Sequence, residues 1–555
     1  MWRLYISILF ISISKLLISQ QSLELELELQ KRGELVVAIQ EEHIELIENI
    51  HSVSIERPIN GQCQVYLNEK QYKYFVANKI PFIPQIAPSF LYDAKMATDI
   101  KELENWDTYP SYETYLDMML QFTIDFPEYC KLDTIGYSVE NRLLLALKIS
   151  DNVVLDETEP EFFYSSSMHG DELVGSVLML RLAHYLLNNL ENKQVANLVN
   201  GIEIYINPLA NPDGTYFTSN NTVQGAIRSN TNGINLNRNY PDPEDGEHPD
   251  GYDYQSETLA MMDFMENRNF VMSMNHHGGA EVINYPWDTF SKLHADNEWF
   301  EFISRNYADT VHMVDEFYLT DLENGITNGY AWYTISGGRQ DYANYFLQCR
   351  EVTSELSTVK LPSASLLPAY WDKNYKSLLN FMEQTLYGVS GFVTDSLGNP
   401  IDAKITVLDH DFDNSQVFTQ DSGVYYRFLK EGIYSFLFET DGYQPIQVDE
   451  VIVKDFERTP LSVKFKIPLG ISQNDLINMK VYPNPAKDFV IIELPQTEHS
   501  NFDIYLYDCF GKQVFNTNCM DAEVCHIPLL NIQAGIYIMS IYNEQVSVNR
   551  KLVVQ

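Results

Sequence analysis

The chain has 555 residues, of which 45% are hydrophobic and 13% aromatic, and its formal net charge at pH 7 is −40. At about 150 residues per domain, this length indicates three or four domains, and the apolar content is typical of folded proteins. The acidic charge argues against nucleic acid or an anionic membrane as a partner, because both require clustered lysine and arginine. Six cysteines without a Cys-x-x-Cys pair argue against a disulfide scaffold or a thiolate zinc module.

The first 20 residues have the features of a secretory signal peptide. Arg3 precedes an apolar stretch from Leu4 to Ile13, and Lys15 then interrupts it. A membrane span needs about 20 apolar residues, so a signal peptide over residues 1–20 is favoured over an anchor, with a buried strand as the alternative. No other segment is apolar enough to span a bilayer, and we therefore expect an exported, soluble protein.

Residues 21–105 are predicted to form a small α/β domain. Residues 22–29 alternate between polar and apolar, which predicts a strand, and residues 34–50 have helical spacing. A second strand region is predicted at 64–77. Three prolines between residues 81 and 88 indicate a linker.

Helical and strand patterns alternate over residues 106–387. Examples are the apolar run Leu143–Ile149, the strand Phe162–Ser166 and the helix Leu173–Leu190. Such alternation predicts a mixed α/β sheet flanked by helices.

The pattern changes after Tyr387. Residues 388–468 contain short alternating segments and turn signals without helical periodicity, which predicts a β-sandwich. Residues 469–555 form a second short-stranded unit. The predicted fold class is therefore α/β, with a mixed central sheet flanked by helices, followed by two all-β modules.

A candidate metal motif, His169-Gly170-Asp171-Glu172, lies between a predicted strand and a predicted helix. An imidazole and a carboxylate three residues apart can face one ion from such a turn. They are two of the three protein ligands of a catalytic zinc, whose fourth position stays open for water. On its own the motif is weak, because a Glu-rich chain gives chance matches, and a capping or core histidine is the alternative.

Three further segments have the residue types that such a site needs. His276 and His277 end an apolar strand and precede two glycines, so a histidine there is a candidate third ligand. The run Asn235–Tyr240 offers amide and guanidinium groups that suit a carboxylate, although such runs are also typical of solvated loops. Glu351 and Glu355 lie four residues apart, and spacing alone does not select the catalytic one.

In this order, the segments resemble those of the zinc metallocarboxypeptidases of the pancreatic and regulatory carboxypeptidase type. The resemblance runs from Tyr109 to about Leu386. Besides the His-Gly-Asp-Glu motif, it rests on residues 211–214 (NPDG), 233–241 (GINLNRNYP), 277–286 (HGGAEVINYP), 325–341 (GITNGYAWYTISGGRQD) and 353–357 (TSELS).

The resemblance implies one zinc ion per chain, with His169, Glu172 and His277 as ligands. His276 precedes the matching position and is expected to be a neighbour of the site. Glu355, not Glu351, matches the general base of the family.

The resemblance also implies a substrate-binding set. Arg228 matches the arginine that polarises the scissile carbonyl. The terminal carboxylate of the substrate would be held by Asn237 and Arg238, with Tyr333 closing over it. Asp288 and Gln340 match the members that favour C-terminal Lys or Arg.

Two positions depart from the family pattern. Asn235 stands where members usually have an aspartate that accepts a hydrogen bond from the first zinc histidine, so the support of that histidine lacks a charge. Arg339 replaces a residue that is usually apolar beside the pocket, and a cation there counts against a preference for basic side chains.

The flanking units resemble known modules. Residues 388–468 resemble a transthyretin-like domain, with a spacer or adhesion module as the alternative. Residues 469–555 resemble the C-terminal sorting domain of type IX secretion, through Tyr482-Pro483-Asn484-Pro485 and Gly535-Ile536-Tyr537. This predicts a secreted or cell-surface protein that the type IX machinery exports. Residues 21–105 match the pro-region of the family in position and size only.

The sequence thus predicts a secreted zinc metallocarboxypeptidase that acts on peptide and protein C-termini. In the implied mechanism, Glu355 takes a proton from zinc-activated water, and zinc and Arg228 stabilise the oxyanion. One alternative is a hydrolase of cell-wall peptides or other amides at the same zinc site. The other is a catalytically inactive adhesion protein, which the intact set of ligands, base and Arg228 disfavours.

Overall fold

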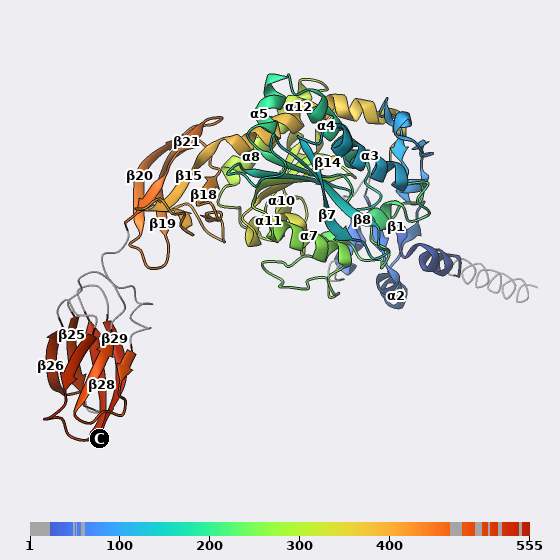
Figure 1. The fold of residues 1–555 in the computed structure, drawn as a ribbon. Helices are drawn as coiled ribbons and strands as arrows, with labels where there is room; N and C mark the ends of the chain where they lie inside the picture. Colours follow the sequence, from blue (N-terminus) through green and yellow to red (C-terminus); the bar gives the residue numbers. More distant parts are fainter. Residues whose placement is uncertain are drawn as a thin grey trace, which may run out of the picture.

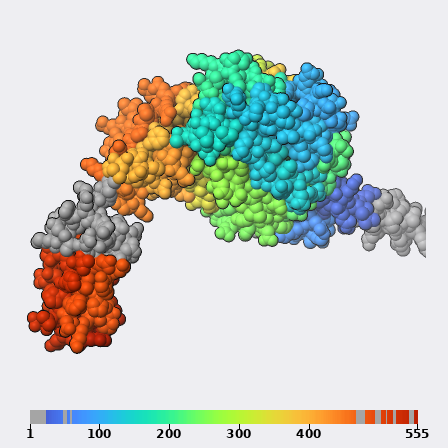
Figure 2. Space-filling model, in the orientation of Figure 1, coloured from blue at the N-terminus to red at the C-terminus, as the bar shows by residue number. Residues whose placement is uncertain are grey.

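The computed structural model describes residues 23–47, 50, 53–56, 61–466, 480–493, 502–508, 511–519, 524–542 and 547–555. The predicted signal peptide, residues 1–20, lies outside them. Figure 1 shows an N-terminal α/β unit and a β-sandwich, both attached to a central α/β domain. In the space-filling view of Figure 2, the central domain and the sandwich form one continuous body. Among the described residues, no helix has the length and apolar character that crossing a membrane requires.

The N-terminal unit is a small sheet with a helix on one face. Its described strands lie in the order β2 (Ser54–Ile55), β3 (Gln62–Leu67), β1 (Leu35–Gln40) and β4 (Ile83–Pro84), and α2 (Glu69–Asn78) follows β3. Val37 and Val65 face a core that includes Phe75 of α2, whereas Val36 and Tyr66 belong to a separate cluster on the opposite face. The predicted α/β character of this unit agrees with these elements.

Two local predictions for this unit are wrong, and a third is wrong in part. The strand region expected at 64–77 ends with β3 at Leu67, and Glu69–Asn78 form helix α2, which Asn68 caps. Residues 23–32 are helical and not a strand, because Leu and Glu are strong helix formers whatever their alternation. The buried positions, Leu29 and Arg32, have helical spacing. Residues Leu35–Gln40 form a strand and not a helix, since their β-branched side chains favour a sheet and pair with β3.

The central domain is built on a mixed sheet, eight-stranded within residues 61–466. From edge to edge the strands are β13 (Ile326–Asn328), β12 (Glu281–Tyr285), β14 (Arg350–Leu356), β11 (Phe270–His277), β9 (Glu161–Ser166), β10 (Glu203–Asn207), β8 (Leu143–Ile149) and β7 (Cys130–Tyr137). The four strands from β14 to β10 are parallel. β12, β8 and β7 are antiparallel to their inner neighbours. The predicted fold class is confirmed.

Helices cover both faces of this sheet (Figure 1). On β9, Phe162 and Tyr164 join the apolar cluster of one face, whereas Phe163 joins that of the other face, as the twofold period of a strand requires. The first face is covered by α4 (Val174–Asn188), α8 (Asn297–His312) and α12 (Leu367–Glu383), and the second by α7 (Ser256–Glu266) and α11 (Arg339–Phe346). Shorter or peripheral helices are α3 (Tyr112–Asp125), α5 (Lys193–Val199), α6 (Pro212–Thr215), α9 (Asp321–Asn324) and α10 (Gly329–Trp332).

The β-sandwich consists of two sheets in its described residues. One contains β15 (Gly388–Asp395), β18 (Val424–Arg427), β21 (Arg458–Pro460) and β22 (Val463–Phe465); the other contains β17 (Val417–Phe418), β16 (Lys404–Val407), β19 (Gly432–Glu439) and β20 (Ile446–Val453). Arg427 of β18 donates to buried Asp296 at 2.8 and 2.7 Å, and Arg350 of β14 binds the same carboxylate at 3.0 and 2.8 Å. This buried network joins the sandwich to the central domain.

The described part of the C-terminal module is also all-β. Its strands form two sheets, β23 (Lys480–Tyr482), β24 (Phe489–Glu493) and β27 (Val524–Pro528), and β26 (Gln513–Cys519), β25 (Phe502–Tyr507), β28 (Gly535–Tyr542) and β29 (Ser547–Val554). Cys519 and Cys525 form a disulfide. Cys63, Cys130 and Cys349 are buried free thiols in the described part of the chain, and Cys509 lies outside it.

Candidate metal centre and active site

The predicted site residues gather at the carboxyl ends of the parallel strands. There, β11 pairs His276 with Ser166 of β9, and it pairs His277 with Glu355 of β14. Binding sites of open α/β sheets form at this edge, because loops leave it and neighbouring side chains converge. The turn that follows β9 adds His169 at the same edge.

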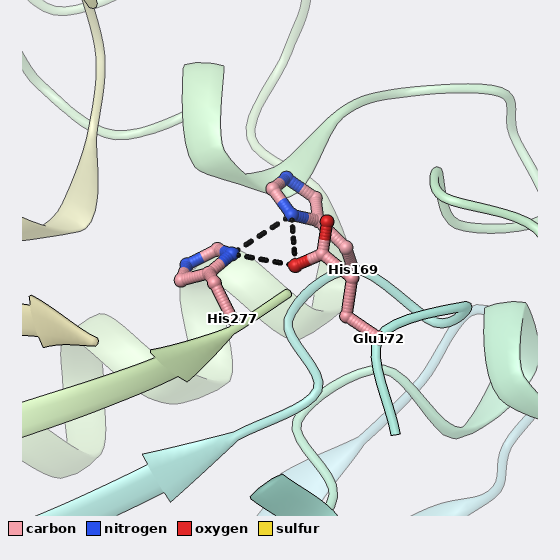
Figure 3. A group of neighbouring side chains, drawn as sticks. All are labelled: His169, Glu172 and His277. Carbon is pink, nitrogen blue, oxygen red and sulfur yellow. Dashed lines mark hydrogen bonds and ion pairs between the residues drawn. The ribbon is translucent and has the colours of Figure 1, made fainter. Parts of the chain in front are cut away.

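Three buried side chains converge on one point (Figure 3). The Nδ1 atoms of His169 and His277 are 2.9 Å apart, and they lie 2.9 and 2.8 Å from Oε2 of Glu172. Three donor atoms this close to one another fit a shared ion, and two imidazoles with one carboxylate are a known ligand set for catalytic zinc. Burial lowers the pKa of both histidines, which keeps their rings neutral, as metal binding requires.

The other nitrogen of each histidine ring also has a partner. Nε2 of His169 lies 3.0 Å from Oδ1 of Asn235, so the amide oxygen can accept the ring proton and leave Nδ1 free for a metal. Nε2 of His277 lies 2.7 Å from Nδ2 of Asn275. Rotation of this amide by 180° would present its oxygen to that nitrogen instead. Asn235 therefore occupies the supporting position that an aspartate usually has in the family.

The second oxygen of Glu172 is held by two cations. Arg228 Nη1 lies 2.5 Å and Lys360 Nζ 2.9 Å from Oε1, while the Gly278 amide donates to Oε2 at 3.1 Å. Burial alone would raise the pKa of Glu172, but His169, Lys360 and Arg228 hold it well below its usual value. The carboxylate thus stays ionised and keeps Oε2 directed at the histidines.

The two candidate bases have different environments on the same strand. Burial, and then the nearby Glu172, raise the pKa of Glu355 well above its usual value, and its Oε2 has no hydrogen-bond partner among the described residues. Glu351 is instead bound by Arg339 and accepts a hydrogen bond of 2.7 Å from Ser273. Glu355 is therefore the one available for proton transfer beside the metal ligands.

The predicted carboxylate-binding residues lie close to this base. Arg238 and Tyr333 share a side-chain hydrogen bond, and burial lowers the pKa of Arg238. Asn237 lies next to Arg238, and its Oδ1 accepts from the Arg339 amide at 3.0 Å. Burial raises the pKa of the half-buried Tyr333 to about 12, so its hydroxyl stays a hydrogen-bond donor at neutral pH.

Asp288 is buried with Gln340 beside it. Gln340 Nε2 and Asn284 Nδ2 donate to Oδ1 of Asp288 at 3.0 and 2.9 Å. The backbone at Gly329 passes so close that an added Cβ would lie 1.8 Å from the same oxygen. Burial raises the pKa of Asp288 to about 6. The structure thus brings together the two predicted specificity residues.

Arg339, the cation that the sequence places beside the pocket, is paired with Glu351. Its guanidinium binds Glu351 through two hydrogen bonds of 3.0 Å, and both side chains are fully buried. The arginine charge is therefore compensated inside the domain.

Sequence reasoning missed several residues of this site. Lys360 and Asn275 contact the metal ligands, yet neither belongs to a pattern that spacing reveals. The missed residues of the N-terminal unit are Glu34, Ser54 and Glu56, which contact Ser229, Asn235 and Lys360. Asn275 could have been found from its position two residues before His277, on the same face of a strand.

Comparisons with known proteins identify two families in the chain. Residues 115–377 match the family described as zinc carboxypeptidase, and residues 480–555 match the secretion system C-terminal sorting domain. The chain is 36% identical to mouse carboxypeptidase D over 357 residues, which cover 61% of this chain and 25% of that protein. It is 33% identical to the human carboxypeptidase N catalytic chain over 403 residues, which cover 65% of this chain and 86% of that protein.

Among solved structures, a match is carboxypeptidase A from Helicoverpa armigera, at 17% identity and a TM-score of 0.48, covering 64% of this chain and 98% of that one. The buried His-Glu-His cluster on a mixed sheet is a candidate zinc centre. The chain belongs to the zinc carboxypeptidase family. It spans about a quarter of the length of the carboxypeptidase D relatives. Its C-terminal sorting domain indicates secretion by the type IX route.

Proposed function

We propose that the chain is a secreted zinc metallocarboxypeptidase that removes the C-terminal residue of peptides and proteins, with a preference for Lys or Arg. One observation carries this proposal. The donor atoms of His169, Glu172 and His277 lie within 2.9 Å of one another, and Arg228 binds the other oxygen of Glu172 at 2.5 Å. A candidate metal site, a carbonyl-polarising cation and, on the strand paired with His277, the proposed base Glu355 therefore lie together, as a zinc peptidase site requires.

In the proposed mechanism, the metal ligands, Glu355 and Arg228 have different roles. Zinc held by His169, Glu172 and His277 would supply Lewis-acid chemistry that activates water and polarises a carbonyl. Glu355 accepts a proton from the attacking water and donates it to the leaving amine. Arg228 donates hydrogen bonds to the carbonyl oxygen as negative charge develops on it.

The remaining residues select the substrate. Asn237 and Arg238 bind the terminal carboxylate, since a guanidinium offers paired donors to its two oxygens, and Tyr333 covers it. Asp288 would receive the ammonium or guanidinium of a C-terminal Lys or Arg, and Gln340 holds the Asp288 carboxylate in place. This set restricts cleavage to the last peptide bond.

The flanking units have proposed roles as well. We assign residues 1–20 to a signal peptide, 21–105 to a pro-region-like domain, 106–387 to the carboxypeptidase domain, 388–468 to a transthyretin-like module and 469–555 to the sorting domain. Support for the last assignment is the match over residues 480–555. Removal of residues 477–555 should then leave peptidase activity intact but prevent delivery to the cell surface. Normal surface delivery of the shortened chain would contradict the sorting role.

The test of the catalytic proposal combines metal content with substrate choice. The purified full chain should contain about one zinc per molecule and release Lys or Arg from peptide C-termini. The same peptide with an amidated C-terminus should be resistant. Hydrolysis of the amidated peptide, or of a cell-wall peptide alone, would favour the other amidase function. Bound zinc without any hydrolysis would favour a binding protein.

A further inference from the structure

The N-terminal unit presents one face of its sheet to the active site. Ser54 of β2 and Tyr66 of β3 are register partners, as are Val36 of β1 and Tyr66, so the three side chains form a row across one face. All three are buried, although Val36 and Tyr66 are separate from the core of their own unit. This face therefore packs on the central domain.

One contact from this face reaches the support of a metal ligand. Asn235 donates through Nδ2 to the hydroxyl of Ser54, while its Oδ1 lies 3.0 Å from Nε2 of His169. An aspartate at position 235 has no proton to donate to this hydroxyl when it is ionised, whereas an asparagine can donate and accept at once. The departure of Asn235 from the family pattern is thus matched by a residue of the N-terminal unit.

A second contact reaches the carboxylate ligand. Lys360 Nζ lies 2.5 Å from Oε1 of Glu56 and 2.9 Å from Oε1 of Glu172, and its side chain is almost fully buried. The Tyr66 ring lies 4.5 Å from the same ammonium and 5.3 Å from the Arg228 guanidinium. Glu56 and Tyr66 therefore fix the cation that orients Glu172.

A third contact anchors the loop between these two supports. Glu34 accepts hydrogen bonds from the backbone amides of Arg228 and Ser229, at 3.2 and 3.1 Å, and from the Ser229 hydroxyl at 3.0 Å. This loop begins at Arg228 and continues to Asn235. The N-terminal unit thus holds both ends of the loop that lies beside the metal centre.

We propose that Ser54 and Glu56 are positioning residues of the metal centre. The N-terminal unit is then part of the active peptidase and not an inhibitory pro-domain that proteolysis must remove. Ser54 acts through Asn235 on His169, and Glu56 acts through Lys360 on Glu172. This inference rests on the proposed function of the site. Partners of metal ligands typically change metal affinity by 10–100-fold when they are removed.

The test uses full-length variants with matched controls. Ser54→Ala removes the acceptor of Asn235, and Ser54→Thr keeps a hydroxyl there. Ser89→Ala is the control, because Ser89 donates to Ala226 at 2.6 Å in the same interface but away from the metal ligands. Glu56→Gln removes the negative charge that faces Lys360, and Glu69→Gln removes an exposed charge of the same unit.

The readouts are the zinc dissociation constant, measured by chelator competition, and the visible absorption spectrum of the cobalt-substituted protein. Ser54→Ala and Glu56→Gln act one contact further from the metal than a direct partner of a ligand, so each should weaken zinc binding by up to about 10-fold, the low end for direct partners, and shift the cobalt bands. Ser54→Thr should restore both properties, and the two controls should match the wild type. Melting curves establish that each variant is folded.

Three outcomes separate the possibilities. Unchanged zinc affinity and cobalt spectra in folded Ser54→Ala and Glu56→Gln variants would overturn the inference. An increase in kcat/KM at unchanged zinc affinity would also overturn it, and would show that the unit is an inhibitory cover. A wild-type chain that binds no zinc would instead refute the proposed function. If Ser54→Ala does not fold, Glu56→Gln alone decides between these outcomes.

Discussion

Arg339 and Glu351 form a fully buried ion pair in which Nε and Nη2 donate to the two carboxylate oxygens at 3.0 Å each. This pair explains how a charged residue can occupy a position beside the pocket that is usually apolar in the family. The pair also engages both carboxylate oxygens of Glu351, which sequence spacing alone leaves as a candidate base beside Glu355. Each charge is compensated by the other inside the domain, so we expect neither side chain to bind substrate or to transfer a proton.

Separating this ion pair should destabilise the protein without altering its chemistry. Arg339→Met leaves Glu351 buried without its counter-charge, which typically costs about 3–5 kcal/mol. We expect a lower melting temperature with unchanged zinc content. The double variant Arg339→Met/Glu351→Met should regain most of the stability, because it removes both charges. A single variant as stable as the wild type would contradict this account.

Substrate preference should depend on Asp288. Losing one partner of a buried charge pair costs about 2–5 kcal/mol, which corresponds to roughly 30- to 4000-fold in kcat/KM. Asp288→Ala should therefore lose most activity on C-terminal Lys and Arg and gain activity on Leu or Phe. Asp288→Asn keeps the size of the side chain and removes only its charge, so it should lose the same preference. A wild-type preference for Phe or Leu that Asp288→Ala leaves unchanged would refute the role.

The preference for basic residues should also depend on pH. Burial raises the pKa of Asp288 to about 6, so the carboxylate is charged above this pH and becomes neutral below it. The ratio of kcat/KM for C-terminal Arg to that for C-terminal Leu should fall as the pH drops through about 6. The ratio cancels titrations that affect both substrates, and kcat/KM reports on the free enzyme. In Asp288→Asn the ratio should be independent of pH over this range.

Sequence motifs predicted the centre of the site because they lie at strand ends. The strand predicted at Phe162–Ser166 is β9 (Glu161–Ser166), and the turn after it brings His169 and Glu172 to the edge where β11 ends in His277. The topology of the sheet then brings these short motifs together. For this reason the order of the motifs was informative even before any distance was known.

The surroundings of the site could not be predicted in the same way. Lys360 contacts Glu172 across 188 positions, and Glu34 contacts Arg228 across 194. Contacts this distant leave no periodic signal in a single sequence. The N-terminal unit also departs locally from its sequence pattern: period-two alternation of Leu and Glu in residues 23–32 indicates a strand, but both residues favour a helix and the segment is helical.

The two adjacent histidines should differ in their effect on zinc. His277 directs Nδ1 at Glu172, at 2.8 Å, whereas His276 Nδ1 lies 2.6 Å from the hydroxyl of Ser354. His277→Ala should abolish zinc binding and activity, while His276→Ala should retain most of each, although it leaves a cavity. Zinc content measured by atomic emission on folded protein checks this. Loss of zinc in a folded His276→Ala variant would reverse the ligand assignment.

Glu355 and Glu351 lie on the same strand, but replacing them should have different effects, on activity for Glu355 and on stability for Glu351. Glu355→Gln keeps the shape of the side chain and removes its ability to take a proton, so activity should fall by about 10²- to 10⁴-fold with zinc content and stability unchanged. Glu351→Gln weakens the ion pair with Arg339, so stability should fall while kcat of the folded enzyme stays near normal. Single-turnover rates and melting curves on both variants separate these effects. Near-normal turnover in Glu355→Gln together with an inactive, fully folded, zinc-loaded Glu351→Gln would assign the base to Glu351, because neither unfolding nor loss of zinc would then explain the lost activity.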